Sequence, residues 1–312
     1  MMRYNTLKQR PRHFQTFTGL TVTEFNKLTE KNKDNWKKQR IERLLNNRPN
    51  RKRKIGGGRK KILNSLEDQL LLSLVWAKLY PTYLLLEYLF GIDESTAFRA
   101  IQEATLLLKG RFALPEQKGV RRGKKISTIA ELKEIIPDLE EILIDTTEQK
   151  IPRPKKKRKR KKHHSGKKKA FTIKKQIATN RQGLIIHSAR ASPGKKHDYK
   201  LFKESGLPEI IPEDVPTYAD SGYQGVNKDY PDLNIIIPHK RTRKHRQLTR
   251  SEKIQNAKQR KIRVKVEHTL SQLKKFKVLA DTYRHSLQNY DIYFDFVASI
   301  VNFRMLQRLP AG

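Results

Sequence analysis

Three acidic residues that lie far apart in the chain share a setting suited to metal chemistry. Asp145 ends the apolar run 142–144, which predicts a buried strand. A charge in that position is costly unless it is paired or binds a cation. Asp220 ends a second predicted strand, and Glu267 lies in the middle of a predicted long helix. Carboxylate oxygens are the ligands that Mg²⁺ and Mn²⁺ prefer, so we expect these three residues to hold two such ions.

Two ions held in this way would support phosphodiester chemistry. They would activate a water or a 3′-hydroxyl group and stabilise the leaving oxygen. Each acidic residue also has an ordinary interpretation: an Asp at a strand end often caps or forms a turn, and Glu267 could pair with Arg263, four residues earlier on its helix. Three such residues in this order are harder to explain in that way.

The elements that must position these residues lie in 139–309. Predicted strands and helices follow one another there in the order β-β-β-α-β-β-α. The expected elements are a strand at 141–145, a hairpin of 170–178 and 183–191 that turns at 180–183, a helix at 198–205, strands at 217–220 and 234–238, and helices at 251–276 and 287–309. This order fits an α/β, RNase H-like catalytic domain with a mixed sheet flanked by helices. In such a sheet, two strand ends and one helix would meet at one edge.

A helix-turn-helix domain is predicted at 63–112. An apolar stripe begins at Leu66, a short helix spans 83–90, Gly91 supplies a turn, and Asp93 caps a third helix. This helix would offer four polar residues to a major groove. They are Ser95, Thr96, Arg99 and Gln102. The alternative is a plain three-helix bundle without groove contacts.

The remaining segments are predicted to be basic and less ordered. In 1–62 we expect an arm with short helices at 22–30 and 36–45, the first opened by a Thr21–Glu24 capping box, and then a glycine-rich basic linker. Residues 113–138 form a second predicted linker.

The charge balance indicates a polyanionic partner. Lys and Arg number 69 against 31 Asp and Glu, which gives a net charge of +38. Such an excess points first to nucleic acid, because the basic segments lack the interleaved apolar face of a membrane-binding helix. The chain has no cysteine, which excludes disulfides and thiolate zinc sites and suits a reducing cytoplasm. We expect neither a membrane span nor a signal peptide.

A run of eight basic residues, 155–162, lies between the first two strands of the catalytic region. We interpret it as a loop that contacts DNA phosphates and so positions the duplex without reading its sequence. The residues that we assign to this contact are Lys157, Arg158, Lys159 and Arg160. A nuclear-localisation look-alike or a solvated loop would have the same composition. The basic block 239–250 is expected to act similarly.

Three sequence blocks resemble DDE transposases of the insertion-sequence 5 type. They are IDTTEQKIPRP at 144–154, PTYADSGYQG at 216–225, and RVKVE at 263–267 with Lys274 seven residues further on. Asp145 and Asp220 are 75 residues apart, and Glu267 follows after another 47. The resemblance covers about residues 60 to 305. One departure is Arg260, where the family often has a tyrosine.

This resemblance implies roles for particular residues. It assigns catalysis and Mg²⁺ or Mn²⁺ binding to the three carboxylates, and DNA contacts to Arg263 and Lys274, which share a face with Glu267. Three further residues are candidates for supporting positions: Glu148, His197, which could touch the scissile phosphate, and Asp198, which could instead only cap a helix.

The resemblance also implies an activity and its partners. The protein would bind the terminal inverted repeats of its own element, free a 3′-hydroxyl group and join that group to target DNA, without a covalent protein–DNA intermediate. Its partner would be double-stranded DNA, bound by a homo-oligomer in the bacterial cytoplasm at the nucleoid. Two alternatives stay open: a non-catalytic DNA-binding protein, and an RNase H-like nuclease without strand transfer.

Overall fold

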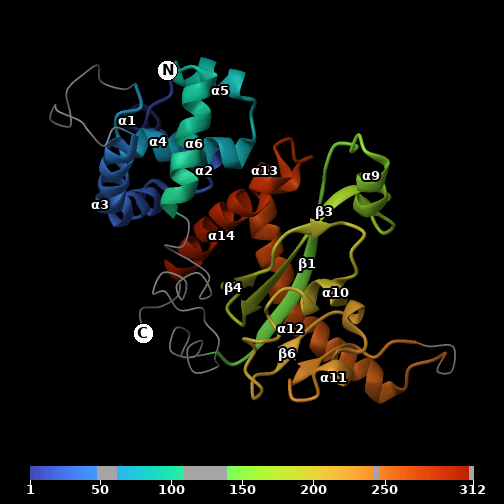
Figure 1. Cartoon of the computed structure of the whole chain (residues 1–312). Helices are drawn as coiled ribbons and strands as arrows, with labels where there is room; N and C mark the ends of the chain where they lie inside the picture. The colour runs from blue at the N-terminus through green and yellow to red at the C-terminus, as the bar shows by residue number, and fades with distance from the viewer. Residues whose placement is uncertain (48–61, 109–138, 242–245, 309–312) are drawn as a thin grey trace.

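The computed structural model describes residues 1–47, 62–108, 139–241 and 246–308. The linkers predicted at 48–61 and 113–138 lie outside these ranges, as does part of the 239–250 basic block. Helices form one end of the molecule and a sheet forms the other, with the C-terminal helices between them (Figure 1). In the part of the chain that the structure describes, no helix is long and apolar enough to cross a membrane.

The N-terminal half is helical, and its three central helices agree with the sequence prediction. They are α4 (Leu66–Leu79), α5 (Tyr83–Phe90) and α6 (Glu94–Leu108). The side chain of Ser65 accepts a hydrogen bond from Asp68 N at the start of α4, and Asp93 accepts one from Thr96 N at the start of α6. Gly91 adopts φ 62° between α5 and α6, a conformation that glycine reaches without strain.

The segment before α4 is more ordered than predicted. It forms α1 (Tyr4–Leu7), α2 (Pro11–Thr18) and α3 (Val22–Asn47). The predicted capping box is present, since Thr21 and Glu24 bond each other's backbone N–H. The two short helices expected after it are one helix of 26 residues. Phe14 and Phe25 are fully buried in the same core as α4 and α6, so the boundary expected at residue 62 is not a break in packing.

The sheet is mixed, as an RNase H-like fold requires, and its path runs β2-β3-β1-β6-β7. Strand β1 (Ile142–Lys150) pairs antiparallel with β3 (Ala170–Asn180) and parallel with β6 (Thr217–Tyr218), which pairs parallel with β7 (Ile235–Ile236). Three short strands pair with β3: β2 (His164–Ser165), β4 (Ile185–Ser188) and β5 (Ser192–Pro193). The predicted turn is present, with Gly183 at φ 86°.

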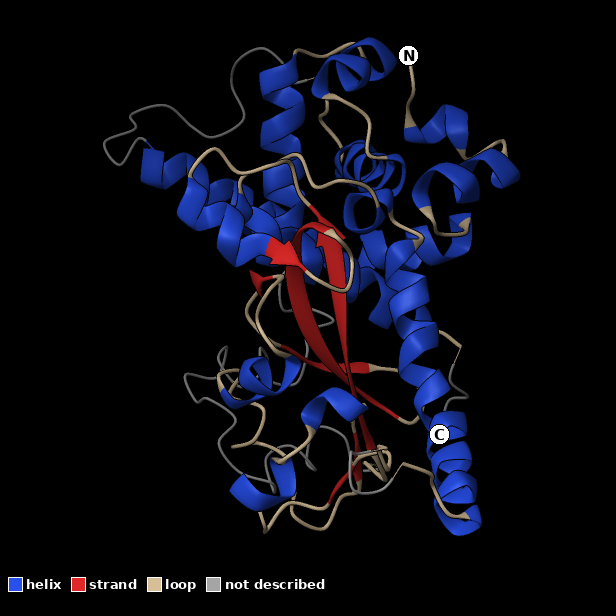
Figure 2. Cartoon of the chain, turned by 90° about the vertical axis from the view of Figure 1, so that its right-hand side faces the viewer, coloured by secondary structure: helices blue, strands red, loops and turns tan. Residues whose placement is uncertain are grey.

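Helices cover both faces of this sheet (Figures 1 and 2). Side chains of Ile142 and Ile144 pack on one face in a cluster with α10 (Asp198–Lys203), η1 (Ser221–Tyr223) and α11 (Val226–Asp229). Leu143 faces the other way, toward the long helix α12 (Arg250–Lys274) and toward α14 (Tyr290–Leu306). Two short elements, α13 (Lys277–Ala280) and η2 (Leu287–Asn289), connect these two helices.

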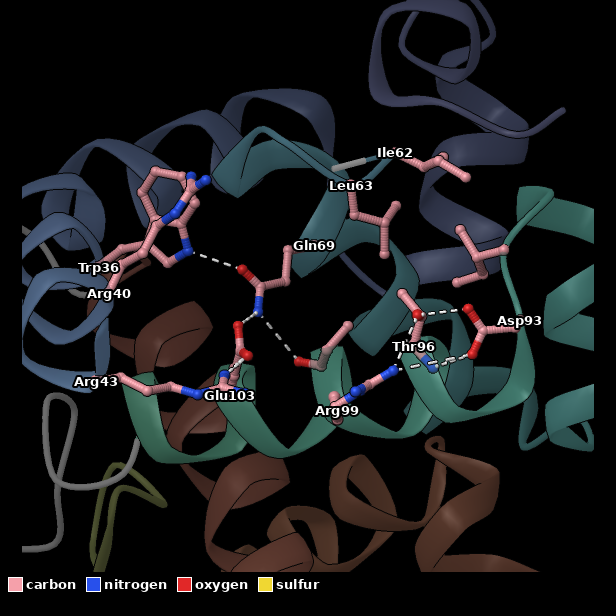
Figure 3. A pocket seen from close by; sticks show the side chains of 12 residues that line it. Trp36, Arg40, Arg43, Ile62, Leu63, Gln69, Asp93, Thr96, Arg99 and Glu103 are labelled. Carbon is pink, nitrogen blue, oxygen red and sulfur yellow. Dashed lines mark hydrogen bonds and ion pairs between the residues drawn. The ribbon is translucent and has the colours of Figure 1, made fainter. Parts of the chain in front are cut away.

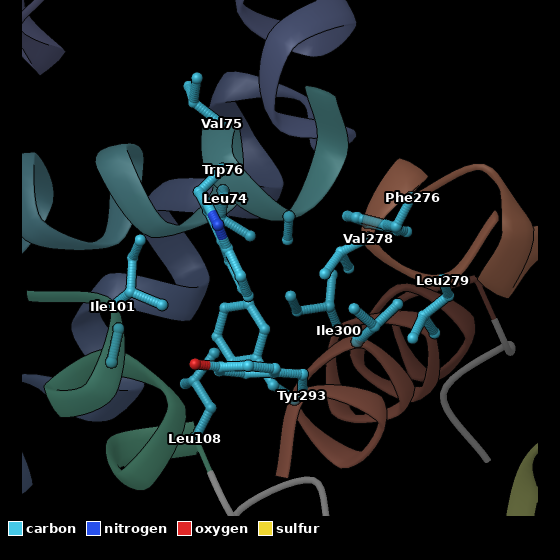
Figure 4. Packing of buried hydrophobic residues seen from close by; sticks show 14 of the residues in the cluster. Leu74, Val75, Trp76, Ile101, Leu108, Phe276, Val278, Leu279, Tyr293 and Ile300 are labelled. Carbon is cyan, nitrogen blue, oxygen red and sulfur yellow. The ribbon is translucent and has the colours of Figure 1, made fainter. Parts of the chain in front are cut away.

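The helical end and the sheet share one hydrophobic core. Trp76 of α4 is fully buried, and its ring centroid lies 4.8 Å from that of Tyr293 on α14 (Figure 4). Phe276 and Val278, which lie at α13, enter the same cluster as Leu74 and Ile101. The C-terminal helices are therefore packed on one side against the sheet and on the other against α4 and α6.

Candidate active site

Asp145 lies within β1, which continues to Lys150 beyond the strand end expected at residue 145, and Asp220 follows the end of the neighbouring parallel strand β6. Leu143 of β1 pairs with Tyr218 of β6, and two more residues along each chain place Asp220 level with Asp145. Asp145 Oδ1 accepts a hydrogen bond from Thr146 N at 2.7 Å, and Asp220 Oδ1 accepts one from Gly222 N at 2.6 Å. Both side chains are half-buried, and the short 3-10 helix after β6 fixes the second one.

Glu267 approaches the same face from α12. Val266 of this helix is fully buried, whereas Glu267 beside it is exposed. The pKa of Asp145 is raised to about 6, chiefly by burial and also by the charges of Asp220 and Glu267, against the lowering effects of the Thr146 hydrogen bond and of Arg263. The charges of two carboxylates that the sequence singled out therefore act on the third, Asp145.

These carboxylates do not form a ready-made coordination sphere. Within residues 1–47, 62–108, 139–241 and 246–308, no three His, Cys, Asp or Glu side chains are close enough to hold one metal ion. The donors are nevertheless all oxygen, which suits Mg²⁺ or Mn²⁺. Asp145 is also a half-buried carboxylate with a raised pKa among like charges, and a cation would stabilise its charged form. The residues thus fit a divalent cation in the chemistry of their donors, although their side chains are not gathered around one point.

Two cationic residues of α12 stand near this carboxylate group. Arg263 is half-buried, and its charge lowers the pKa of Asp145. The pKa of Lys274 is lowered by its own burial and by Lys168, while the charge of Asp145 acts in the opposite direction. The predicted shared face of Arg263, Glu267 and Lys274 thus lies near Asp145 of β1.

Sequence reasoning missed Lys174, which lies on β3 opposite Glu148. Its Nζ lies 2.8 Å from Asp198 Oδ1 and 3.5 Å from Glu148 Oε1, and it donates a third bond to Lys196 O at 2.9 Å. Its side chain is only 9% exposed. A signal was available, because two consecutive lysines interrupt the apolar pattern of the 170–178 strand, and lysine is rarely buried without a partner.

Among the expected supporting residues, the structure differs from the sequence prediction only in the helix cap. Asp198 does not cap α10: the N-cap residue is His197, without a side-chain cap bond, and Asp198 pairs with Lys174 instead. The reason is the nearby buried cation, which binds the carboxylate more strongly than a helix N–H would. Glu148 also accepts a hydrogen bond from Thr172 Oγ1 at 2.8 Å. His197 is exposed and lines a cavity beside Asp198.

The helix-turn-helix residues divide into two groups. Arg99 is exposed at the start of α6, where it donates to Ser95 O and Ser95 Oγ. Ser95 and Thr96 donate their hydroxyls to Asp93. Gln102, expected to face a groove, instead donates to the Tyr293 hydroxyl at 2.6 Å and is half-buried, because α14 packs against this part of α6. The structure thus contradicts a groove-facing Gln102.

A polar cavity of about 280 Å³ lies between α3, α4 and α6 (Figure 3). Gln69 occupies its centre: it accepts from Trp36 Nε1 at 2.7 Å and donates to Glu103 Oε2 at 2.8 Å. Arg43 pairs with Glu103 at the same place. These bonds show how α3 is held against the three-helix unit.

The basic run forms part of a helix rather than a loop. Lys157–His163 is α9, which packs against β3. Lys157, Arg158 and Lys159 are exposed, and Arg160 is half-buried. His163 is buried, and its Nδ1 lies 3.0 Å from Thr172 O, which attaches the helix to the sheet. The positive charges are thus displayed on a fixed element next to the first strand.

Comparisons with known proteins agree with this arrangement. A family model described as DDE superfamily endonuclease matches residues 144–302, and one described as helix-turn-helix of DDE superfamily endonuclease matches residues 61–113.

Two relatives are named as transposases. A probable transposase for insertion sequence element IS702 of Microchaete diplosiphon is 28% identical over 257 residues, which cover 82% of this chain and 86% of the relative. A putative transposase for insertion sequence element IS112 of Streptomyces albus G is 30% identical over 98 residues, which cover 31% of this chain and 35% of the relative. No solved structure matches significantly.

Proposed function

Because the chain belongs to the DDE superfamily endonucleases, we propose that it is the transposase of an insertion sequence of the IS-5 type. In this proposal it binds the terminal inverted repeats of its element, cleaves there to free a 3′-hydroxyl group, and joins that group to target DNA. The extended likeness to a probable IS702 transposase supports the general activity, and the matched helix-turn-helix supports DNA binding.

The observation that carries the proposal is that Asp220 and Glu267 lie near enough for their charges to act on Asp145, next to strongly basic elements. Asp145, Asp220 and Glu267 would hold two divalent cations, Mg²⁺ or Mn²⁺, which when bound supply activation of the attacking oxygen and stabilisation of the leaving oxygen. The residues themselves prepare this site. The short 3-10 helix orients Asp220 through Gly222 N, and α12 delivers Glu267 to the face on which Asp145 lies.

Cationic residues of the same chain would hold the DNA. Arg263 and Lys274 flank the carboxylates and would contact phosphate close to the reacting one. Lys157, Arg158, Lys159 and Arg160 of α9 would contact the backbone further away, and Arg99 of α6 would contact the element end. Contacts of this kind fix the position of a duplex, whereas base contacts would specify its sequence.

Lys174 would act as a positioning residue for this site. It holds Glu148 and Asp198, and Asp198 lies next to the Gly222 turn that orients Asp220. His197, exposed at the start of α10, would lie within reach of a bound phosphate. We further propose a homo-oligomer on double-stranded DNA at the nucleoid, and a reaction without a covalent protein–DNA intermediate.

A cleavage and joining assay tests this function. The substrate is DNA that carries the inverted repeats flanking the gene, incubated with Mg²⁺ and a labelled target duplex. Asp145→Asn, Asp220→Asn and Glu267→Gln should each abolish cutting yet retain DNA binding. The exposed carboxylate variant Asp229→Asn should cut normally.

The outcomes separate the alternatives. Cutting without joined product would indicate a nuclease without strand transfer. Tight, salt-dependent binding with no metal-dependent cutting would indicate a DNA-binding protein. Normal cutting by any of the three active-site variants would overturn the residue assignment.

A further inference from the structure

A cavity of about 330 Å³ opens beside the carboxylate group and has two distinct layers. Its floor contains Glu148, Lys174 and Asp198, joined by ion pairs. Lysine side chains from three separate segments surround it. They are Lys167, Lys168, Lys195, Lys196 and Lys274.

The cations around the cavity are only partly neutralised. Lys196 pairs with Glu204, but no described carboxylate lies within ion-pair distance of Lys168, Lys195 or Lys274. Lys168 and Lys274 approach closely enough for the charge of the first to lower the pKa of the second. Like charges converging on a recess without counter-charges create a positive potential that attracts an anion.

The loop that carries Lys195 is held in place by three bonds. Gly194 N donates to Thr172 O at 2.9 Å, and Lys195 N donates to Lys162 O at 3.2 Å. Lys174 Nζ donates to Lys196 O at 2.9 Å. A side chain at Gly194 would force Thr172 or the loop to move, since its Cβ would lie 1.8 Å from Thr172 Oγ1. The lysines are thus presented by a fixed backbone, which lowers the cost of binding.

The floor limits what kind of anion can enter. Lys174 is shared by two carboxylates, so the floor is not positive, and Glu148 and Asp198 would repel phosphate that penetrates deeply. An anion would therefore rest at the mouth among the lysines. This arrangement suits a single phosphodiester of a passing strand better than a free nucleoside triphosphate, whose three phosphates would crowd the carboxylates.

The cavity is contiguous with the carboxylate group. Thr146 lines the cavity and donates its N–H to Asp145. Lys274 also lines it, and the charge of Asp145 acts to raise the pKa of Lys274. We propose that this cavity is a phosphate subsite for the DNA strand that continues from the scissile phosphodiester, with Lys168 and Lys195 as contacts and Lys174 as the positioning residue. The placement relative to the scissile phosphate rests on the proposed function.

Because the natural chain has no cysteine, a single introduced thiol can test the subsite. Lys168→Cys and Lys195→Cys are mixed with a short duplex that carries a bromoacetyl group on one backbone phosphorothioate. Lys228→Cys on α11 is the matched control, since this exposed lysine does not line the cavity. We expect both cavity thiols to cross-link and the control to stay at background. Equal cross-linking of all three would overturn the proposal.

Salt dependence gives a second readout that does not require cutting. Lys168→Gln should reduce the slope of log affinity against log salt by about 1, as loss of one phosphate contact does, whereas Lys228→Gln should not. An equal reduction of this slope in both variants would mean that the cations act only through net charge and would overturn the subsite. Protection of the cavity thiols from iodoacetamide by inorganic phosphate or ATP, but not by the duplex, would overturn the DNA assignment.

The same measurements distinguish this proposal from the transposase assignment. Cross-linking in the cavity by a protein that never cuts DNA would leave the subsite standing and reject the enzymatic function. Normal cutting by a protein whose cavity thiols do not cross-link would reject the subsite and leave the enzymatic function standing.

Discussion

At the scale of single residues, Asp145 is held in a state that disfavours its charge. Its pKa is raised to about 6, mainly by burial and in part by two further carboxylates. A folded-state pKa above the unfolded value means that the ionised group opposes folding at neutral pH. At the proposed metal site, a bound cation would remove this cost because it stabilises the charged form.

The Asp145→Asn variant should therefore be more stable than the natural chain in EDTA at pH 8. A shift of about 2 pKa units corresponds to about 3 kcal/mol. Above pH 6 the aspartate is charged in both states and the full penalty applies. As the pH falls from 6 toward 4, the folded aspartate takes up a proton and the advantage of the variant disappears. Urea unfolding at pH 8 and pH 4 measures both values, and a variant less stable at pH 8 would contradict this account.

A functional role for a single residue could be predicted where a charged side chain falls at a position that the apolar pattern predicts to be buried. The carboxylate after the apolar run 142–144 was such a case. Lys174 was a similar conflict, but its partners could not be named, because Glu148 and Asp198 reach it only through strand register and the start of α10. The Gln102 prediction was wrong because helical spacing gives a face, and only the packing of α14 shows that this face is covered.

At the scale of elements, a buried ion cluster joins the central strand to the last helix. Lys175 on β3 is 1% exposed, and its Nζ lies 2.6 Å from Asp291 and 3.7 Å from Asp295, both on α14. Ala191 N also donates to Asp291 at 2.9 Å. The cluster fixes α14 against the sheet face that carries Asp145.

Removing both carboxylates of this cluster should strongly destabilise the fold. The double variant Asp291→Asn/Asp295→Asn leaves a buried lysine without compensation, which typically costs about 3–5 kcal/mol. Adding Lys175→Met should restore most of that loss, because the uncompensated charge is gone. The exposed pair Lys203–Asp229 supplies the control, and Asp229→Asn should leave the urea midpoint unchanged. If Lys175→Met restored none of the lost stability, the ionic explanation would be contradicted.

Element types were largely predictable, and element ends less so. The three helices at 66–108, the hairpin, and the order of strands follow from periodicity and turn residues. The start of α12 could be predicted from Thr249 and Glu252, which form a capping box. The sequence did not indicate that the two predicted helices merge into α3. The polar residues at 31–35 continue this helix because its other side packs on α4 and α6.

At the scale of the whole molecule, the DNA-binding helices and the catalytic sheet depend on one core. Trp76, Tyr293 and Phe276 belong to a single buried cluster that reaches from α2 to α14. Lys78 Nζ donates to Lys275 O at 2.8 Å, and Tyr80 Oη accepts from Arg284 N at 2.8 Å. Sequence analysis separated the helix-turn-helix from the catalytic region, because contacts between distant segments leave no local pattern.

Because the core is shared, a mutation that destabilises the helical end should also destabilise the sheet. Trp76→Ala should cost about 3–5 kcal/mol, as removal of a buried tryptophan does. Amide exchange in β1 and β3 should then accelerate by the factor that corresponds to the global loss, although these strands do not contain the mutation. Unchanged protection in the strands would show that the two ends unfold independently.

The central claim is that Asp145, Asp220 and Glu267 share divalent cations, and a Mn²⁺ titration of the full chain followed by electron paramagnetic resonance tests it most directly. The natural chain should bind Mn²⁺ saturably, with Mg²⁺ as a competitor. Asp145→Asn, Asp220→Asn and Glu267→Gln should each lose this binding while Asp229→Asn retains it. Equal Mn²⁺ binding by the natural chain and all three active-site variants would contradict the claim.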